Sequence, residues 1–132
     1  MDEISINLPA KPEYMSVARL TTAGLANRLG FTIDDIEDLK VAVSEAGNYL
    51  INQFSDITVL NIHYRIESDD RIYVQIKVPG AAAVVNENKS KESELSLFII
   101  ESVADQVKKE IDRGVIRGFS ILKTGGGNLK NE

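Results

Sequence analysis

Two runs of alternating apolar residues, separated by a short polar segment, most constrain how this chain folds. Every second side chain is apolar in residues 60–66 and again in 72–78, and the sequence ESDD lies between the two runs. Such alternation is typical of strands with one buried face, and two such runs joined by a short turn predict a β-hairpin. Another layer must therefore cover one face of this hairpin.

Helical spacing of apolar residues predicts three helices that could form that layer. The first spans about residues 14–29, and its apolar side is expected to hold Val17, Leu20, Gly24 and Leu25. The second spans about 32–53, with the stripe Ile36, Leu39, Val43, Ala46 and Leu50. Thr32, followed three residues later by Asp35, predicts a capping box at its start. The third is expected near 95–107, with a core face of Leu95, Phe98, Ile99, Ser102, Val103 and Val107.

The remaining segments complete an α+β pattern. Residues 4–8 alternate as a strand, residues 79–94 read as a long loop, and two further strands are expected near 108–111 and 115–124. Helices with one apolar stripe and strands with one apolar face predict a two-layer sandwich, in which helices cover one face of a mostly antiparallel sheet. We expect one domain over residues 1–124 and a flexible tail over 125–132.

Composition narrows the class of partner. The 132 residues carry a net charge of −5, which argues against direct nucleic-acid binding because that requires a basic face. The chain has no cysteine, and no apolar run approaches the ~18 residues of a membrane span. Its acidic, alternating N-terminus is unlike a signal peptide. We therefore expect a cytoplasmic protein that does not enter membranes.

The stretch VAVSEAGNYLINQF, residues 41–54, contains the candidate chemistry. Glu45, Asn48 and Asn52 are spaced three and four apart, which places a carboxylate and two amides on one helix face. Periodicity alone leaves two interpretations open. These residues form a polar helix edge, or they form a face that binds a ligand.

Residues 9–46, PAKPEYMSVARLTTAGLANRLGFTIDDIEDLKVAVSEA, resemble the anti-sigma factor serine/threonine kinases of the anti-sigma-B and anti-sigma-F type. That family belongs to the GHKL, or Bergerat-fold, ATPases. The later stretch LSLFIIESVADQV resembles another of its helices. The resemblance implies an ATP pocket between helices and sheet, and homodimerisation. It also implies partner switching, in which the protein sequesters a sigma factor and phosphorylates an anti-sigma antagonist. It assigns Arg19 to partner binding, for which a solvated helix arginine is the alternative.

The first family motif has a Glu that acts as base and, four residues later, an Asn that holds Mg²⁺. Glu45 matches the Glu, but Tyr49 stands four residues on and Asn48 three. A one-residue deletion would align Asn48 with the Mg²⁺ ligand. The same shift would align Asn52-Gln53-Phe54 with the family's His-x-Tyr.

Two further motifs depart more strongly. Gly80 keeps the glycine of the adenine-binding Asp-x-Gly, but Val78 replaces the Asp, and an unpaired buried amino group costs roughly 1–3 kcal/mol. In the glycine-rich phosphate turn before the third helix, SELSL at 93–97 puts Glu94 and Ser96 where the family has glycine. A Thr on the last strand is matched only by Ser120.

Our leading hypothesis is an anti-sigma-type regulatory protein with a degenerate nucleotide pocket, in which ATP, ADP and Mg²⁺ binding is weak or lost. The alternative is a working ATP-dependent serine kinase that uses Glu45 and Asn48. A third possibility is that the pocket takes another small ligand, since Val78 and residues 81–83 would make it more apolar.

Overall fold

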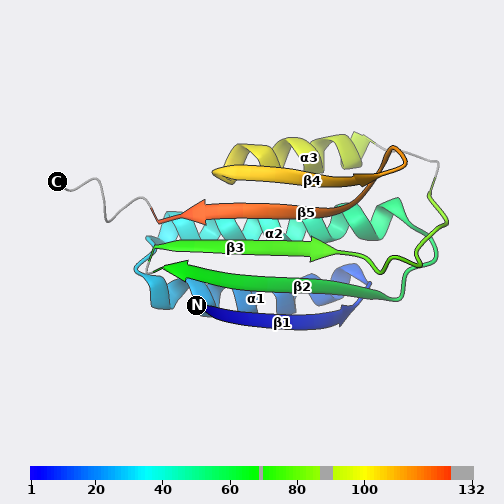
Figure 1. The fold of residues 1–132 in the computed structure, drawn as a ribbon. Coiled ribbons are helices and arrows are strands. Elements are labelled where there is room, and N and C mark those ends of the chain that lie inside the picture. Colours follow the sequence, from blue (N-terminus) through cyan, green and yellow to red (C-terminus); the bar gives the residue numbers. More distant parts are fainter. Residues whose placement is uncertain (69, 87–90, 126–132) are drawn as a thin grey trace.

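The computed structural model describes residues 1–68, 70–86 and 91–125 and has two layers, a five-stranded sheet and a layer of helices on one of its faces (Figure 1). The strands are β1 (Asp2–Pro9), β2 (Val59–Ser68), β3 (Arg71–Lys77), β4 (Gln106–Asp112) and β5 (Val115–Thr124). The helices are α1 (Met15–Ala26), α2 (Ile33–Gln53) and α3 (Lys91–Val103), with short 3-10 turns at Pro12–Tyr14 (η1) and Asn27–Leu29 (η2). This arrangement confirms the predicted fold class.

Every neighbouring pair in the sheet order β1-β2-β3-β5-β4 is antiparallel. The predicted hairpin is β2–β3, where Ile62 lies opposite Ile76 and Tyr64 opposite Val74, all four fully buried. Helix α2 packs against β3 and β5 between α1 and α3, so it forms the centre of the helical layer (Figure 1). The core therefore lies between α2 and the inner face of the sheet.

Helix α2 begins as its sequence predicts. The Asp35 amide donates to Thr32 Oγ1 at 3.1 Å, and the Thr32 amide donates to Asp35 Oδ2 at 3.3 Å, which completes the capping box. The helix ends where Phe54 adopts an extended conformation. The predicted stripe is correct at Leu39, Val43, Ala46 and Leu50, which are fully buried.

The predicted apolar side of α1 is correct only at Leu25, which packs against the core. Val17 and Leu20 are 41% and 73% exposed, whereas the buried side consists of Met15, Ala18, Thr22 and Ala26. Small side chains let α1 approach its neighbours closely, and the Thr22 hydroxyl meets the buried Tyr64 hydroxyl at 2.7 Å. Close packing selects the small residues for the inside and leaves larger apolar ones in contact with solvent.

The third helix also differs from prediction. It spans Lys91–Val103 instead of about 95–107, and Val107 belongs to β4. Its buried residues are Ser96 and Ile100, while Leu95 and Phe98, predicted to be core, are 56% and 67% exposed. Residues 93–97, the stretch compared with the family's phosphate turn, therefore lie wholly inside the helix, although only 95–97 were expected to be helical.

The first residue of the predicted tail, Gly125, follows the end of β5 and is held in place. The Gly125 amide donates to the Asp70 carbonyl at 2.7 Å, and Gly125 lies against the Phe31 ring. Residues 126–132, the rest of that predicted tail, lie outside the described residues.

Candidate functional site

A cleft of about 350 Å³ opens between α2, α3 and the η1 turn. Four of the residues singled out from the sequence line it together: Glu45, Asn48, Asn52 and Ser96. Glu92, Leu95, Ile99 and Pro12 supply the remaining walls. The ligand-binding interpretation of the α2 face is therefore supported by geometry, because these polar side chains border a hollow rather than a flat solvated surface.

The polar groups of the cleft are unequally satisfied. Ser96 Oγ donates to Glu45 Oε1 at 2.8 Å and so joins α3 to α2. Asn48 Oδ1 is buried and accepts no hydrogen bond from any described residue. A buried carbonyl oxygen without a donor costs free energy, so this atom marks the position in the cleft that most favours a ligand.

The described residues that line this cleft do not include three other site residues predicted from the sequence, namely Val78, Gly80 and Ser120. Val78 is 6% exposed and belongs to the core, and Gly80 lies in open surroundings where a Cβ would meet nothing within 4 Å. Ser120 lies on the outer face of the sheet, because its neighbours Phe119 and Ile121 point into the core, and it donates to Glu110 Oε2 at 3.1 Å. Ser120 therefore lies on the opposite face of the sheet from the helices and away from this cleft.

Residues 79–86, which follow β3 and which we call the strap, are fastened along their length. The Ala82 amide donates to the Pro79 carbonyl at 3.0 Å, and the Asn86 amide donates to the Gln53 carbonyl at 2.7 Å. The Ser55 amide donates to the Val84 carbonyl at 3.0 Å, and Val85 forms a β-bridge with Phe54. The predicted long loop is thus an ordered segment in this part, bound to the end of α2.

Arg117, at the start of β5, holds the strap from the other side. Its guanidinium donates to the Ala82 carbonyl and lies 5.2 Å from the centre of the Phe54 ring. Its Nε is 3.6 Å from Asp112 Oδ2. Sequence reasoning missed this residue, although a signal existed. Arg117 is two residues before the buried Phe119, so alternation along β5 places it on the inner face of the sheet.

Asp56 completes this fastening. Its Oδ2 accepts a hydrogen bond from the Ala83 amide at 3.0 Å. That bond lowers the pKa of the Asp56 carboxyl, and the nearby positive charge of Arg117 lowers it further. Asp56 thus stays ionised and keeps the middle of the strap against the end of α2.

The residues fit Mg²⁺ and ATP only in part. The unpaired Asn48 oxygen suits a metal ligand, and Glu45 lies in the same cleft. The phosphate and base positions do not fit. The amides of residues 95–97 are used by hydrogen bonds within α3, Glu92 and Glu94 add negative charge to its first turn, and Val78 offers no acceptor. We therefore derive no reaction step through a nucleotide.

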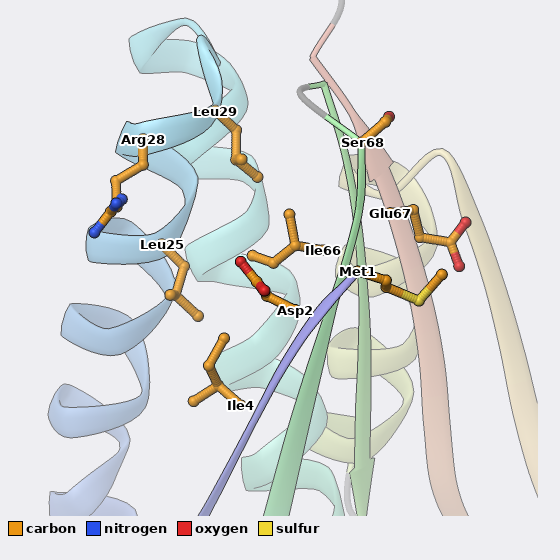
Figure 2. A pocket seen from close by; sticks show the side chains of 9 residues that line it. All are labelled: Met1, Asp2, Ile4, Leu25, Arg28, Leu29, Ile66, Glu67 and Ser68. Atoms are coloured by element: carbon orange, nitrogen blue, oxygen red, sulfur yellow. The ribbon is translucent and has the colours of Figure 1, made fainter.

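A larger hollow, of about 590 Å³, lies at the β1 edge of the sheet, between the end of α1, the start of β1 and the end of β2 (Figure 2). Ile4, Leu25, Leu29 and Ile66 give it an apolar floor, and Asp2, Arg28 and Glu67 are the charged residues at its sides. None of the site residues singled out from the sequence is among the described residues that line it.

The family model for the histidine kinase-like ATPase domain matches residues 8–117, so the chain belongs to that family. Curated relatives are more specific. The chain is 37% identical over 132 residues to the serine-protein kinase RsbW of Oceanobacillus iheyensis, across 87% of this chain and 83% of the relative. It is 32% identical over 130 residues to RsbW of Bacillus cereus strain B4264, across 86% and 81%. The resemblance to anti-sigma factor kinases of the GHKL superfamily is thereby confirmed.

A solved structure agrees with the fold. The crystal structure of the RsbU and RsbW domains of Rv1364c from Mycobacterium tuberculosis matches with a TM-score of 0.66 at 14% identity. The match covers 94% of this chain and 32% of that longer chain, and supports the fold alone. Within the described residues, no helix is both long and apolar enough to cross a membrane.

Proposed function

We propose that this chain is an anti-sigma-type regulatory protein of a bacterial partner-switching system, acting in the cytoplasm by protein–protein contact. In this proposal it binds a sigma factor, an anti-sigma antagonist or both, as a homodimer, and its nucleotide pocket is degenerate. The membership of the histidine kinase-like ATPase family and the RsbW relatives support the regulatory class. The site geometry supports the loss of nucleotide chemistry.

One observation carries the proposal: residues 93–97 are helical, and Ser96 is bonded to Glu45. A phosphate-binding turn needs free backbone amides and small residues so that phosphate oxygens can approach. Here the amides of residues 95–97 are used inside α3, and the Ser96 hydroxyl engages the carboxylate that the resemblance assigns as base. The helical conformation of residues 93–97 opposes the approach of phosphate, and the Ser96–Glu45 hydrogen bond competes with proton abstraction by Glu45.

The strap supports the same conclusion for the side of the pocket that would hold adenine. The resemblance puts the adenine acceptor at position 78, where a buried valine stands. The strap begins at the next residue, and two of its backbone groups are held in place: Arg117 donates to the Ala82 carbonyl, and Asp56 accepts from the Ala83 amide. Opening this region for a purine would break both of these hydrogen bonds, one to the Arg117 guanidinium and one to the Asp56 carboxylate.

Arg19 is consistent with a partner-binding role. It is half-buried on α1 and forms no ion pair with any described residue. The exposed Leu20 follows it in the chain, and the exposed Val17, three residues before Leu20, shares Leu20's side of the helix. A guanidinium with apolar neighbours is a common composition for the centre of a protein interface.

The second candidate function is an active ATP-dependent serine kinase, as the relatives' names describe those proteins. It is favoured by the shared cleft of Glu45 and Asn48 and by the unpaired Asn48 oxygen. In that case Glu45 would accept the proton of the substrate hydroxyl and Asn48 would hold Mg²⁺.

Capture of partners with and without nucleotide separates the two candidates. The purified chain should retain a sigma factor or an antagonist protein from its host equally well with no nucleotide, with Mg-ADP and with Mg-ATP. Retention by Asn48→Ala should be just as independent of nucleotide. The same samples, incubated with labelled ATP, should yield no phosphoserine on the antagonist. Retention that requires nucleotide, or labelling that Glu45→Gln abolishes, would establish the kinase instead.

A further inference from the structure

The cleft between α2 and α3 has two unlike sides. Glu45 and Glu92 are acidic, whereas Leu95, Ile99 and Pro12 are apolar. Among the described residues that line it, none is lysine, arginine or histidine. A site with this composition is complementary to a long side chain that has a hydrocarbon stem and a positively charged end.

The hydrogen-bonding capacity of the cleft points the same way. Asn48 Oδ1 lacks a donor among the described residues, and the one hydrogen bond found for the Glu45 carboxylate, from Ser96 Oγ, leaves it able to accept more. A guanidinium carries five N–H donors in a planar fork, so one group can serve both a carboxylate and an amide oxygen. An ammonium is a compact charge and spans two acceptors less well.

An apolar surface continues outward from the cleft. Leu95, which lines it, is 56% exposed, and Phe98, one turn further along α3, is 67% exposed. Residues three apart lie on the same side of a helix, so the two side chains form one ridge. An exposed phenylalanine beside a polar cleft is typical of a surface that another protein covers.

We infer that the α2–α3 cleft, together with the Leu95–Phe98 ridge, is a docking site for a partner segment that inserts an arginine and lays adjacent apolar residues on the ridge. The guanidinium bonds to Glu45 and Asn48, and its stem lies along Leu95 and Ile99. This inference rests on the proposed function, since it requires that no nucleotide fills the cleft. The net charge of −5 favours a basic partner segment over an acidic one.

A nucleotide-free titration tests the inference separately from the proposed function. The probe is an acetylated, amidated peptide with one arginine between two leucines, added to the isotope-labelled chain and followed by NMR. We expect shifts of the Asn48 side-chain amide and of α3 backbone amides. Citrulline in place of arginine, which is neutral and of nearly the same shape, should weaken binding at least about tenfold.

Matched variants locate the contact. Glu45→Gln should weaken peptide binding at least about tenfold, whereas Glu37→Gln, an exposed position earlier on α2, should not. Phe98→Ser should weaken it several-fold, whereas Ile33→Ser, at a position that is 79% exposed, should not. Phe98→Ser leaves the core intact because Phe98 is 67% exposed, so this variant remains informative if Glu45→Gln is unstable.

Three results would overturn the inference. Equal binding of the arginine and citrulline peptides would show that the chain does not recognise the guanidinium charge. Peptide-induced shifts confined to another surface would show that the peptide does not bind in the α2–α3 cleft. MgCl₂ alone, if it shifts the Asn48 amide while the arginine peptide does not, would make this a metal site. Each of these can occur while partner capture remains independent of nucleotide, so the proposed function would survive them.

Discussion

Replacing Arg117 by methionine should release the strap, because methionine keeps an unbranched stem and removes only the guanidinium. The lost hydrogen bond to the Ala82 carbonyl involves a charged donor and is worth roughly 1.5–3 kcal/mol. The lost stacking on Phe54 adds ~0.5–1 kcal/mol. The pair with Asp112 adds little, since the Asp112 side chain is 60% exposed. The total is about 2–4 kcal/mol, which corresponds to a fall in Tm of about 10 °C for a domain of this size.

Thermal unfolding followed by circular dichroism measures the fall, and hydrogen exchange locates it. The Ala82, Ala83 and Asn86 amides, each hydrogen-bonded in the strap, should exchange much faster in Arg117→Met. Arg28→Met, at an exposed arginine, is the matched control and should change neither quantity. A Tm within 1–2 °C of the parent, with unchanged exchange in the strap, would show that Arg117 does not hold this segment.

Other substitutions test the packing, the pocket and the pH dependence of stability. Gly24→Ala should raise the free energy of unfolding by ~0.5–1 kcal/mol in urea titrations, since the added Cβ would meet nothing within 4 Å. Gly47→Ala should lower it by ~1–3 kcal/mol, because that Cβ would lie 2.5 Å from Met15 Sδ. Val78→Asp should lower the free energy of unfolding by roughly 2–5 kcal/mol because it buries an unpaired carboxylate, and it should not produce Mg-ATP binding in calorimetry. A stable variant that binds ATP would contradict the conclusion that the adenine position is closed. Burial raises the pKa of Tyr64 to about 12, above its ordinary value near 10, so the folded state keeps the proton longer than the unfolded state. Stability should therefore fall by about 2–3 kcal/mol as the pH rises from 10 to 12, and this part of the loss should be absent in Tyr64→Phe.

The sheet and the central helix are predictable because their signals are local and redundant. Alternation in 60–66 and 72–78 fixes which side chains face inward, and Thr32 with Asp35 fixes where α2 begins. These patterns need no knowledge of the partner layer. The fold class follows from them once each apolar face requires cover.

The inner faces of α1 and α3 are less predictable because hydrophobicity alone does not choose between competing stripes. In α1 the buried side is made largely of small residues, and only the neighbouring Tyr64 and α2 determine that Ala18 and Thr22 turn inward. In α3 the acidic residues Glu92 and Glu94 indicate an earlier start, since the helix dipole favours acids in the first turn.

The candidate site was predictable where one helix carries it. Spacing on α2 places Glu45, Asn48 and Asn52 together, and the structure brings Ser96 of α3, which the resemblance had singled out, to the same cleft. The assignment of Ser120 relied on the resemblance, whereas alternation with Phe119 puts Ser120 on the outer face. Alternation likewise indicates Arg117, but its contact with the strap requires the tertiary fold.

Calorimetric titration of the chain with Mg-ATP and Mg-ADP tests the central claim most directly. We predict no heat of binding for either nucleotide up to millimolar concentration, for the parent chain and for Asn48→Ala alike, because the phosphate and base positions are filled by the chain's own groups. Micromolar binding by the parent chain that disappears in Asn48→Ala would contradict the account, since the amide face of α2 would then be holding a metal-bound nucleotide.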